Sequence, residues 1–350
     1  MKINHYIASI ATASPPYVFR QDEIKDFMLK HYSVKLNMRN RDILIKVFNH
    51  PSMQKRNFAF ENLEVLLNET PDEKIARFTE WAIKLSTEAV QSAIAKAGLN
   101  VKDISALIVN TCTGYLCPGI STYLIDSLGL NGDARVYDMV GSGCGGAIPN
   151  LELCCGLLKE SPEGAVVSVS VEICSCTYQM GDDLSLIFSN ALFGDGAAAA
   201  VIWNRPEGLE IVSSRSRYAT QYREDIRFIY KNGQLHNQLS SRLPKLAART
   251  AAKTTNELLE PKGLTVEDIE YWVMHSGGER VINEIKSEIG LNEKQITATR
   301  NVLAQWGNVS SPTVWFVLNE LQKESLAKDK WLVMLAFGAG LAAHGMLLKT

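Results

Sequence analysis

The sequence predicts an α/β protein made of two similar halves, with five alternating layers of helices and sheets. Apolar segments typical of buried strands, such as 165–173 and 331–337, alternate with helical segments. This pattern is typical of parallel or mixed sheets covered by helices. In addition, the segment 98–109, a turn that leads into a strand, is echoed at 263–274. Both copies follow a predicted helix, so each is the same helix-turn-strand unit.

Two further segments repeat in the same order along the chain. The small-residue turn at Gly143-Cys144 is echoed at Gly307-Asn308, and the segment 193–199 is echoed at 337–343. Only two long copies are present, which excludes a solenoid of short repeats. The echoes place the boundary near 203–208, so we expect one half at 1–205 and the other at 206–350.

The individual elements follow from local signals. In chain order, we expect a strand, a helical region, a long helix, a strand and a helix at 7–13, 21–67, 71–97, 134–140 and 150–159. Pro15-Pro16 ends the first strand, and Asn49-His50-Pro51 interrupts the helical region. Thr70-Pro71, followed by acidic residues, is typical of a helix start.

The composition limits the possible functions. The chain has 350 residues, of which 46% are hydrophobic and 21% charged, and a formal net charge of -2. Nucleic-acid binding needs a concentrated basic surface, which this balance does not support. No signal peptide or membrane-spanning run is expected, so we predict a soluble cytoplasmic protein without nucleic-acid or membrane partners. The seven cysteines all lie within 112–176 and are expected to be reduced thiols, without a metal site.

Cys144 lies in a run of small residues, 140–149, between an extended segment and a helical one. Glycines on both sides let a substrate approach the backbone closely. The positive end of the following helix favours the thiolate form of the cysteine, which suggests a nucleophile. The alternative is a buried small residue where a helix and a strand pack tightly, and this segment alone does not separate the two.

His275 and Asn308 each lie at the end of a predicted buried strand of the second half. In open α/β proteins, ligands bind where strands end beside helix starts. A lone histidine after an apolar strand is more often a structural residue. Here, however, the repeat relates it to Cys144 and Asn308, and Cys-His-Asn becomes the leading catalytic group.

The chain resembles the type III polyketide synthases, the chalcone-synthase-like branch of the thiolase-fold condensing enzymes. The resemblance runs from about residue 5 to residue 348. The segments that carry it are Gly143-Cys144-Gly145-Gly146, 189–199, His275-Ser276-Gly277-Gly278, 307–311 and 337–340. It implies a homodimer of duplicated thiolase-like αβαβα subunits that uses coenzyme A thioesters directly as substrates, without a carrier protein, and needs no cofactor.

The resemblance also assigns the chemistry. It implies that Cys144 takes the acyl group of an acyl-CoA starter as a thioester. His275 would form a thiolate-imidazolium pair with it and, with Asn308, would donate hydrogen bonds to the enolate left when malonyl-CoA loses carbon dioxide. The enolate carbon then attacks the acyl-Cys144 carbonyl, and the chain grows by two carbons before release or cyclisation.

Further site residues follow only from the resemblance. Phe193 corresponds to an aromatic gatekeeper, and Cys117 to a residue that reaches into the cavity of the dimer partner. The other expected cavity residues are Thr113, Cys174, Asn237, Phe337 and Gly338. The expected coenzyme A contacts are Lys55, Arg56, Gly277 and Arg280.

The sequence departs from the pattern of the plant enzymes at several cavity positions. Asn237 stands at an aromatic position, Ser276 replaces a frequent proline, and His344 replaces a frequent glutamate. The segment 336–340 lacks the family's first glycine and its proline. Starter, number of extensions and cyclisation mode therefore stay open.

Four alternatives were weighed against this hypothesis. A ketoacyl synthase that accepts groups from an acyl carrier protein would be supported by a basic docking patch, and the cations look scattered in the sequence. A thiolase would need a second cysteine near the C-terminus, and none follows Cys176. A hydroxymethylglutaryl-CoA synthase would need a general base, for which Glu172 is a weak hint. A non-catalytic protein on the same fold is the remaining alternative.

Overall fold

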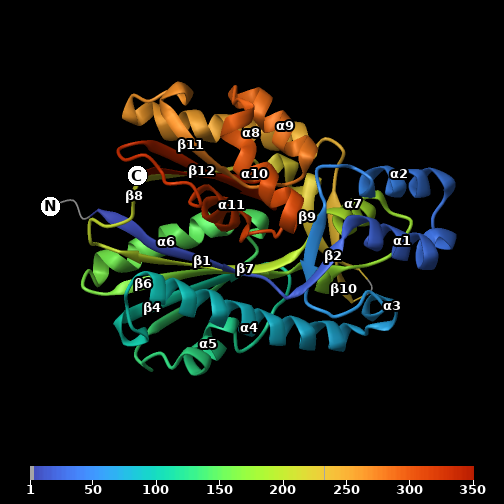
Figure 1. Ribbon diagram of the computed structural model, residues 1–350, viewed down its shortest axis with the longest axis horizontal. Coiled ribbons are helices and arrows are strands. Elements are labelled where there is room, and N and C mark those ends of the chain that lie inside the picture. Colours follow the sequence, from blue (N-terminus) through green and yellow to red (C-terminus); the bar gives the residue numbers. More distant parts are fainter. Residues whose placement is uncertain (1–3, 232) are drawn as a thin grey trace.

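A mixed β-sheet forms the frame of the molecule, and the structure, a computed structural model, describes residues 4–231 and 233–350 (Figure 1). In these residues the sheet has nine strands. From edge to edge they are β11 (Ile269–Met274), β12 (Trp331–Gly338), β13 (Ala342–Lys349), β8 (Leu209–Tyr218), β1 (His5–Ala13), β7 (Asp195–Trp203), β6 (Ala165–Ile173), β4 (Ile104–Thr111) and β5 (Arg135–Val140). Strand β4 runs parallel to β5 and β6, and β11 runs parallel to β12, whereas the other pairs are antiparallel.

The strand order confirms the duplication. Strands β1, β7, β6 and β4 of the first half have the same order as β8, β13, β12 and β11 of the second. The two sets meet where β1 pairs with β8 over only three residue pairs. The loop between β7 and β8 contains the boundary expected at 205/206.

The repeated turn before β4 and β11 has one physical basis in both halves. The short helical turns η2 (Val101–Asp103) and η7 (Val266–Asp268) each begin with a capping box. The Asp103 carboxylate accepts a hydrogen bond from the Asn100 N–H at 2.8 Å, and the Asp268 carboxylate accepts one from the Thr265 N–H at 2.8 Å. Satisfying these backbone donors fixes the turn that starts each strand.

The strands of the two halves form two layers, and helices lie in three layers, one between the halves and one on each outer face. This gives the five layers expected (Figure 1). Helices α4 (Pro71–Lys96) and α5 (Ile120–Leu128) pack on the outer face of the first half. Helices α6 (Ala147–Glu160) and α11 (Thr313–Leu321) lie between the two halves and share one core cluster with both. The outer face of the second half is covered by α8 (Leu243–Leu259) and α9 (Glu279–Ile289), with α10 (Glu293–Trp306) beside them.

Most of the smaller elements gather at one end of the sheet, around the site described below. They include the hairpins β2 (Tyr17–Arg20) with β3 (Lys55–Phe58) and β9 (Ile226–Lys231) with β10 (Gln234–Leu239). The helices are α1 (Gln21–Tyr32), α2 (Met38–Phe48), α3 (Val65–Asn68) and α7 (Leu184–Leu192). The short turns are η1 (Ser33–Lys35), η3 (Gly143–Gly145), η4 (Cys174–Thr177) and η5 (Thr220–Asp225), whereas η6 (Glu260–Lys262) follows the far end of α8.

The expected helical region at 21–67 is only partly right. Helices α1 and α2 lie within it, and α2 ends at Phe48, just before the Asn49-His50-Pro51 interruption. The segment Lys55–Phe58 is instead a strand, because it pairs with β2 and buries Phe58 completely. Pairing with a distant segment outweighs local helical preference here. None of the helices in the described ranges is long and apolar enough to cross a membrane.

Candidate active site

Cys144 lies in η3, at the junction between β5 and α6, as the sequence predicted. The neighbouring glycines are required by packing. Gly143 has φ +57°, and a Cβ atom there would lie 2.9 Å from the backbone nitrogen of Ala339. A Cβ at Gly145 would lie 2.8 Å from the ring of His344. The glycines therefore let the turn after β12 close over the cysteine segment, while Cys144 itself faces a cavity.

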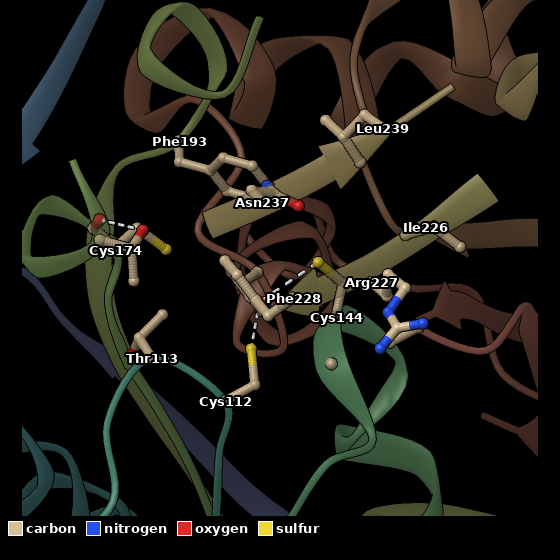
Figure 2. A pocket seen from close by; sticks show the side chains of 14 residues that line it. Cys112, Thr113, Cys144, Cys174, Phe193, Ile226, Arg227, Phe228, Asn237 and Leu239 are labelled. Atoms are coloured by element: carbon tan, nitrogen blue, oxygen red, sulfur yellow. Dashed lines mark hydrogen bonds between the residues drawn. The ribbon is translucent and has the colours of Figure 1, made fainter. Parts of the chain in front are cut away.

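The cavity beside Cys144 has a volume of about 30 Å³, which is room for about two water molecules. Four expected residues line it together with the cysteine (Figure 2): Thr113, Cys174, Phe193 and Asn237. The hairpin β9–β10 supplies one wall, including Phe228, which the sequence did not single out.

Asn308 is held close to Cys144 by Ser310. The backbone of Asn308 pairs with α7 and Phe193: its N–H donates to Leu192 O at 2.9 Å, and its carbonyl accepts from Gly194 N at 3.0 Å. The Ser310 N–H donates to Asn308 Oδ1 at 2.8 Å, and the Ser310 hydroxyl donates to Cys144 Sγ at 3.2 Å. Since Oδ1 is engaged, the NH₂ end of the amide is the end that can face a substrate.

His275 follows β11 directly, and its ring is buried. Its backbone N–H donates to Leu335 O at 2.8 Å, which fixes the residue at the strand end. The ring meets Phe337 edge to face, with centroids 4.8 Å apart. Within the described part of the chain, Nδ1 has no hydrogen-bond partner. A buried nitrogen of this kind is unfavourable unless a substrate or water pairs with it.

Burial sets the charge of both reactive groups in the free protein. It raises the pKa of Cys144 to about 12, against the lowering effect of the Ser310 hydrogen bond. It lowers the pKa of His275 to about 3. The expected thiolate-imidazolium pair is therefore wrong for the ligand-free state, because desolvation outweighs the helix N-terminus. The resting groups are a thiol and a neutral imidazole.

This charge state predicts how the reactivity of Cys144 changes with pH. Below a pKa of about 12, the thiolate fraction rises about tenfold for each pH unit. We expect the rate of iodoacetamide alkylation of Cys144, followed by peptide mass spectrometry, to keep rising from pH 6 to pH 9. A rate that is already level above pH 7 would instead show a preformed ion pair.

A buried carboxylate, Glu172 on β6, connects several site residues. It accepts hydrogen bonds from the Cys112 N–H at 2.9 Å, the Thr113 hydroxyl at 2.9 Å and the Ser311 hydroxyl at 2.7 Å. Its Oε1 also lies 3.3 Å from the Ser310 hydroxyl, whose single hydrogen is donated either to Glu172 or to Cys144. Burial raises the pKa of Glu172, and these hydrogen bonds oppose that rise. Glu172 therefore reaches Cys144 only through Ser310, which positions both.

Sequence reasoning missed Ser310 and Cys112 and gave Glu172 little weight. The available signal was the position of Glu172, a single acid in the fully buried strand 165–173. A buried acid needs hydrogen-bond donors around it, and the Cys112 and Ser310–Ser311 segments supply them. Cys112 contacts two of these groups: its Sγ lies 3.3 Å from Glu172 Oε1 and 3.5 Å from the Ser310 hydroxyl.

Arg56 is not available to a coenzyme A phosphate, contrary to the expectation from sequence. Its side chain is 0% exposed and donates to the carbonyl oxygens of Asn190 at 2.7 Å and Phe193 at 2.8 Å. Its guanidinium also lies 5.0 Å from the ring centre of Phe58. Burial lowers its pKa to about 10. Arg56 thus supports the turn that carries Phe193.

Replacing Arg56 by methionine is expected to destabilise the protein by about 3 kcal/mol or more, because buried carbonyl groups lose their donor. The shift of the urea-unfolding midpoint measures this effect. The control is Arg280→Met, since the Arg280 side chain is 66% exposed and exposed substitutions change stability little. Equal midpoints for the two variants would contradict the supporting role.

Three further predicted residues have packing roles. A Cβ at Gly277 would lie 2.6 Å from the ring of Phe337, and one at Gly338 would lie 2.6 Å from Gly145 N. Gly277 therefore allows the approach of a ring. Phe337 and Gly338 lie behind the cavity wall, to which their neighbour Ala339 contributes.

The remaining predicted residues lie apart from the cavity. Lys55 is partly buried on β3, and Arg280 is exposed on α9, 4.0 Å from Glu284. Their roles as coenzyme A contacts stay predictions. Cys117 is exposed in the loop after β4, outside the cavity of its own chain. His344 is buried and shares a hydrogen bond of 2.8 Å with the Ser216 hydroxyl.

Comparisons with known proteins agree with this fold. The family model described as FAE1/type III polyketide synthase-like protein matches residues 21–227. The model of the C-terminal domain of chalcone and stilbene synthases matches residues 210–350.

Characterised relatives align over most of the chain. A 3,5-dihydroxyphenylacetyl-CoA synthase of Streptomyces toyocaensis is 27% identical, over 87% of this chain and 81% of its own length. The alpha-pyrone synthesis polyketide synthase-like Pks18 of Mycobacterium tuberculosis is 26% identical, over 97% of this chain and 90% of its own.

Solved structures show the same fold. The polyketide synthase PKS-I of the brown alga Ectocarpus siliculosus has a TM-score of 0.92 and 27% identity, covering 100% of this chain and 99% of its own. The 1,3,6,8-tetrahydroxynaphthalene synthase of Streptomyces coelicolor has a TM-score of 0.91 and 21% identity, covering 98% of this chain and 99% of its own. At that identity the second likeness concerns the fold alone.

Proposed function

The chain belongs to the type III polyketide synthases, and we propose that it loads an acyl-CoA starter onto Cys144 and extends it with malonyl-CoA. The observation that carries the proposal is the placement of Cys144 on the wall of a cavity, with Ser310 joining it to Asn308. A nucleophile with a fixed amide beside it is what a decarboxylative condensation needs.

In loading, the Cys144 thiol gives its proton to the neutral imidazole of His275. The sulfur attacks the thioester carbonyl of the starter, the bond to coenzyme A breaks, and the proton leaves with the coenzyme A thiolate. Burial lowers the pKa of His275, so the imidazole is neutral before loading. The same shift makes the ring a weak base, so the proton transfers as the sulfur bonds to the starter carbonyl and the thiol becomes more acidic.

Extension uses the same pocket. The bond between the malonyl carbon and its carboxylate breaks, carbon dioxide leaves, and the electron pair forms an enolate on the thioester. Hydrogen bonds from His275 and the Asn308 amide would stabilise that oxygen. The enolate carbon then attacks the acyl-Cys144 carbonyl and releases the sulfur. These steps move protons and electron pairs only, so we propose that no metal or redox cofactor takes part.

The working unit is proposed to be a homodimer that buries the β5 edge. Strand β5 pairs with β4 on one side and ends the sheet. Large apolar side chains are exposed around it, including Tyr115, Tyr137 and Val140, and such a patch is typical of an interface. Cys117 lies in the adjoining loop, which supports its expected position against the partner.

Light scattering is expected to give twice the chain mass of 38.7 kDa. The double variant Tyr137→Glu/Val140→Glu should shift this value toward one chain, because it places charges in the apolar contact. Tyr230→Glu, at a tyrosine that is 76% exposed on β9, is the matched control and should stay dimeric. A wild-type mass of a single chain would contradict the proposal.

The cysteines support a reducing compartment, which we propose is the cytoplasm. All seven are free, and three of them, Cys112, Cys144 and Cys174, line the cavity. Thiols remain reduced in the cytosol, and the nucleophile must be reduced to accept an acyl group.

Mass spectrometry of reaction products tests the proposed function. Malonyl-CoA is offered alone and with short, long-chain and aromatic acyl-CoA starters. The proposal expects products longer than the starter by whole two-carbon units, in the absence of any carrier protein. Starter hydrolysis without extension, for every starter in the panel, would contradict it and favour a non-catalytic protein or a different condensing enzyme.

A further inference from the structure

Helix α8 carries a row of cations along its solvent-exposed face. The row consists of Arg242, at the N-cap, and Lys245, Arg249 and Lys253. The spacing of three and then four residues places them on one side of a helix. Every other residue from Leu243 to Thr255 is buried or partly buried. We call these four residues the α8 row.

The charge of the α8 row is largely uncompensated. Among the residues that the structure describes, no carboxylate lies within 4.0 Å of Lys245, Arg249 or Lys253, whereas Arg242 pairs with Asp225 at 2.9 Å. Like charges four residues apart repel each other on a helix. The row is therefore a concentrated positive surface on a chain of net charge -2.

Three acids on α8 and α9 are already engaged with other cations. Glu257, at the end of α8, pairs with Arg215 at 3.1 Å and also with Arg217. On α9, which packs against α8, Glu284 lies 4.0 Å from Arg280, and Glu279 pairs with Arg300. These pairings leave the row free for an external anionic partner.

The row begins at the wall of the Cys144 cavity. Asp225, the partner of Arg242, directly precedes Ile226, which lines that cavity. The other side of the same wall is Leu239, three residues before Arg242. The Ser240 N–H donates to Asp225 O at 2.9 Å and ties the two segments together. A partner seated on the row therefore lies next to the segments that enclose the reactive cysteine.

We propose that the α8 row docks an acidic acyl carrier protein that delivers the starter to Cys144. The proposal rests on the proposed function, because acyl carrier proteins present acyl thioesters on the same pantetheine arm as coenzyme A. From Arg242 to Lys253 the row extends about 17 Å along the helix axis. That length matches about three turns of an acidic helix and exceeds the span of a single phosphate group. Charge complementarity of this kind steers association and sets partner choice.

The row also corrects an expectation from the sequence, in which the cations looked scattered. Between these cations lie apolar residues and one threonine, so no cluster is visible in the sequence. The helical spacing places the cations on one exposed face, and the residues between them are buried or partly buried. A malonyl-CoA extender and a carrier-protein starter are compatible, since the two substrates react in separate steps.

The test compares two donors of the same acyl group, chosen as the best starter of the product assay. One is the acyl-CoA, and the other is that acyl group on the acyl carrier protein of a bacterial fatty-acid synthase. The variant is Lys245→Glu/Arg249→Glu/Lys253→Glu, and its matched control is Lys102→Glu/Lys159→Glu/Lys328→Glu, at exposed lysines elsewhere. Malonyl-CoA is the extender in every reaction.

The row variant is expected to lower kcat/KM for the carrier-protein donor by about tenfold or more, and for acyl-CoA by less than about twofold. The control variant should match the wild type with both donors. Added salt should weaken only the carrier-protein reaction. If the glutamate variant does not fold, as judged by its thermal transition, the corresponding glutamine variant replaces it.

Three results would overturn the proposal. A wild-type protein that cannot use the carrier-protein donor excludes it. An equal loss of kcat/KM with both donors assigns the row to coenzyme A binding. The row is assigned to a membrane surface if the protein binds phosphatidylglycerol vesicles only when the row is intact and shows no preference for the carrier protein. Activity with acyl-CoA and malonyl-CoA in any of these cases leaves the proposed function standing.

Discussion

Replacing Cys144 by alanine is expected to abolish the covalent acyl-enzyme and to lower product formation by at least about a thousandfold. The sulfur is the atom that carries the growing chain, and no other group on the cavity wall replaces it in that position. Intact-protein mass spectrometry after incubation with the starter acyl-CoA checks this, since the wild type should gain the mass of one acyl group per chain.

Two other cysteines serve as controls for this prediction. Cys155→Ala, on α6 and away from the cavity, should keep the adduct. Cys112→Ala is the sharper control, because Cys112 lies on the same cavity and near the same Ser310 hydroxyl as Cys144. An adduct that persists in Cys144→Ala and disappears in Cys112→Ala would move the nucleophile to Cys112.

Replacing Asn308 by alanine is expected to slow malonyl-CoA decarboxylation about a hundredfold to a thousandfold, the effect of losing one donor to a developing oxyanion. Loading of Cys144 should remain, because the thiol and the imidazole are unchanged. Release of labelled carbon dioxide measures the first step, and the acyl-enzyme mass measures the second. His275→Gln should impair both, because His275 also accepts the thiol proton.

Asn237→Ala is the matched control for Asn308→Ala. Asn237 is also a buried asparagine, and it lines the cavity from β10, but it has no role in the proposed enolate site. The control should alter the products more than the decarboxylation rate. Undiminished decarboxylation in Asn308→Ala would remove that residue from the site.

Much of the fold could be predicted because the same local signals occur twice. The turns at 98–109 and 263–274 share a capping box, a local feature that a sequence displays directly. The repeated segments 193–199 and 337–343 match less well in structure, since Phe193 lies in the loop before β7 whereas Phe337 is still on β12. The strand at Lys55–Phe58 was missed because its pairing partner, Tyr17–Arg20, lies far away in sequence.

The sequence predicted those site residues whose place follows from the order of the helices and strands along the chain. Cys144 lies in η3 before α6, and His275 directly follows β11. Asn308 lies just after helix α10, whereas the sequence suggested the end of a strand there. Burial was not predictable in the same way. Arg56 follows Lys55 and looks like a second surface cation, but strand pairing turns it into the interior, where it bonds to the turn of Phe193.

Features that depend on several distant segments were also missed. Glu172 draws its hydrogen bonds from the segments of Cys112 and Ser310, which are remote from it in the chain. The charge states of Cys144 and His275 follow from burial, and the sequence suggested the opposite state for the free protein. Only the assembled cavity fixes these properties.

The most direct test of the account follows carbon from malonyl-CoA labelled with carbon-13 at all three malonyl carbons. We expect every extension to add two labelled carbons to the product and to release one labelled carbon dioxide, with neither event in Cys144→Ala. Carbon dioxide release without labelled product, or labelled product from Cys144→Ala, would contradict condensation on this cysteine.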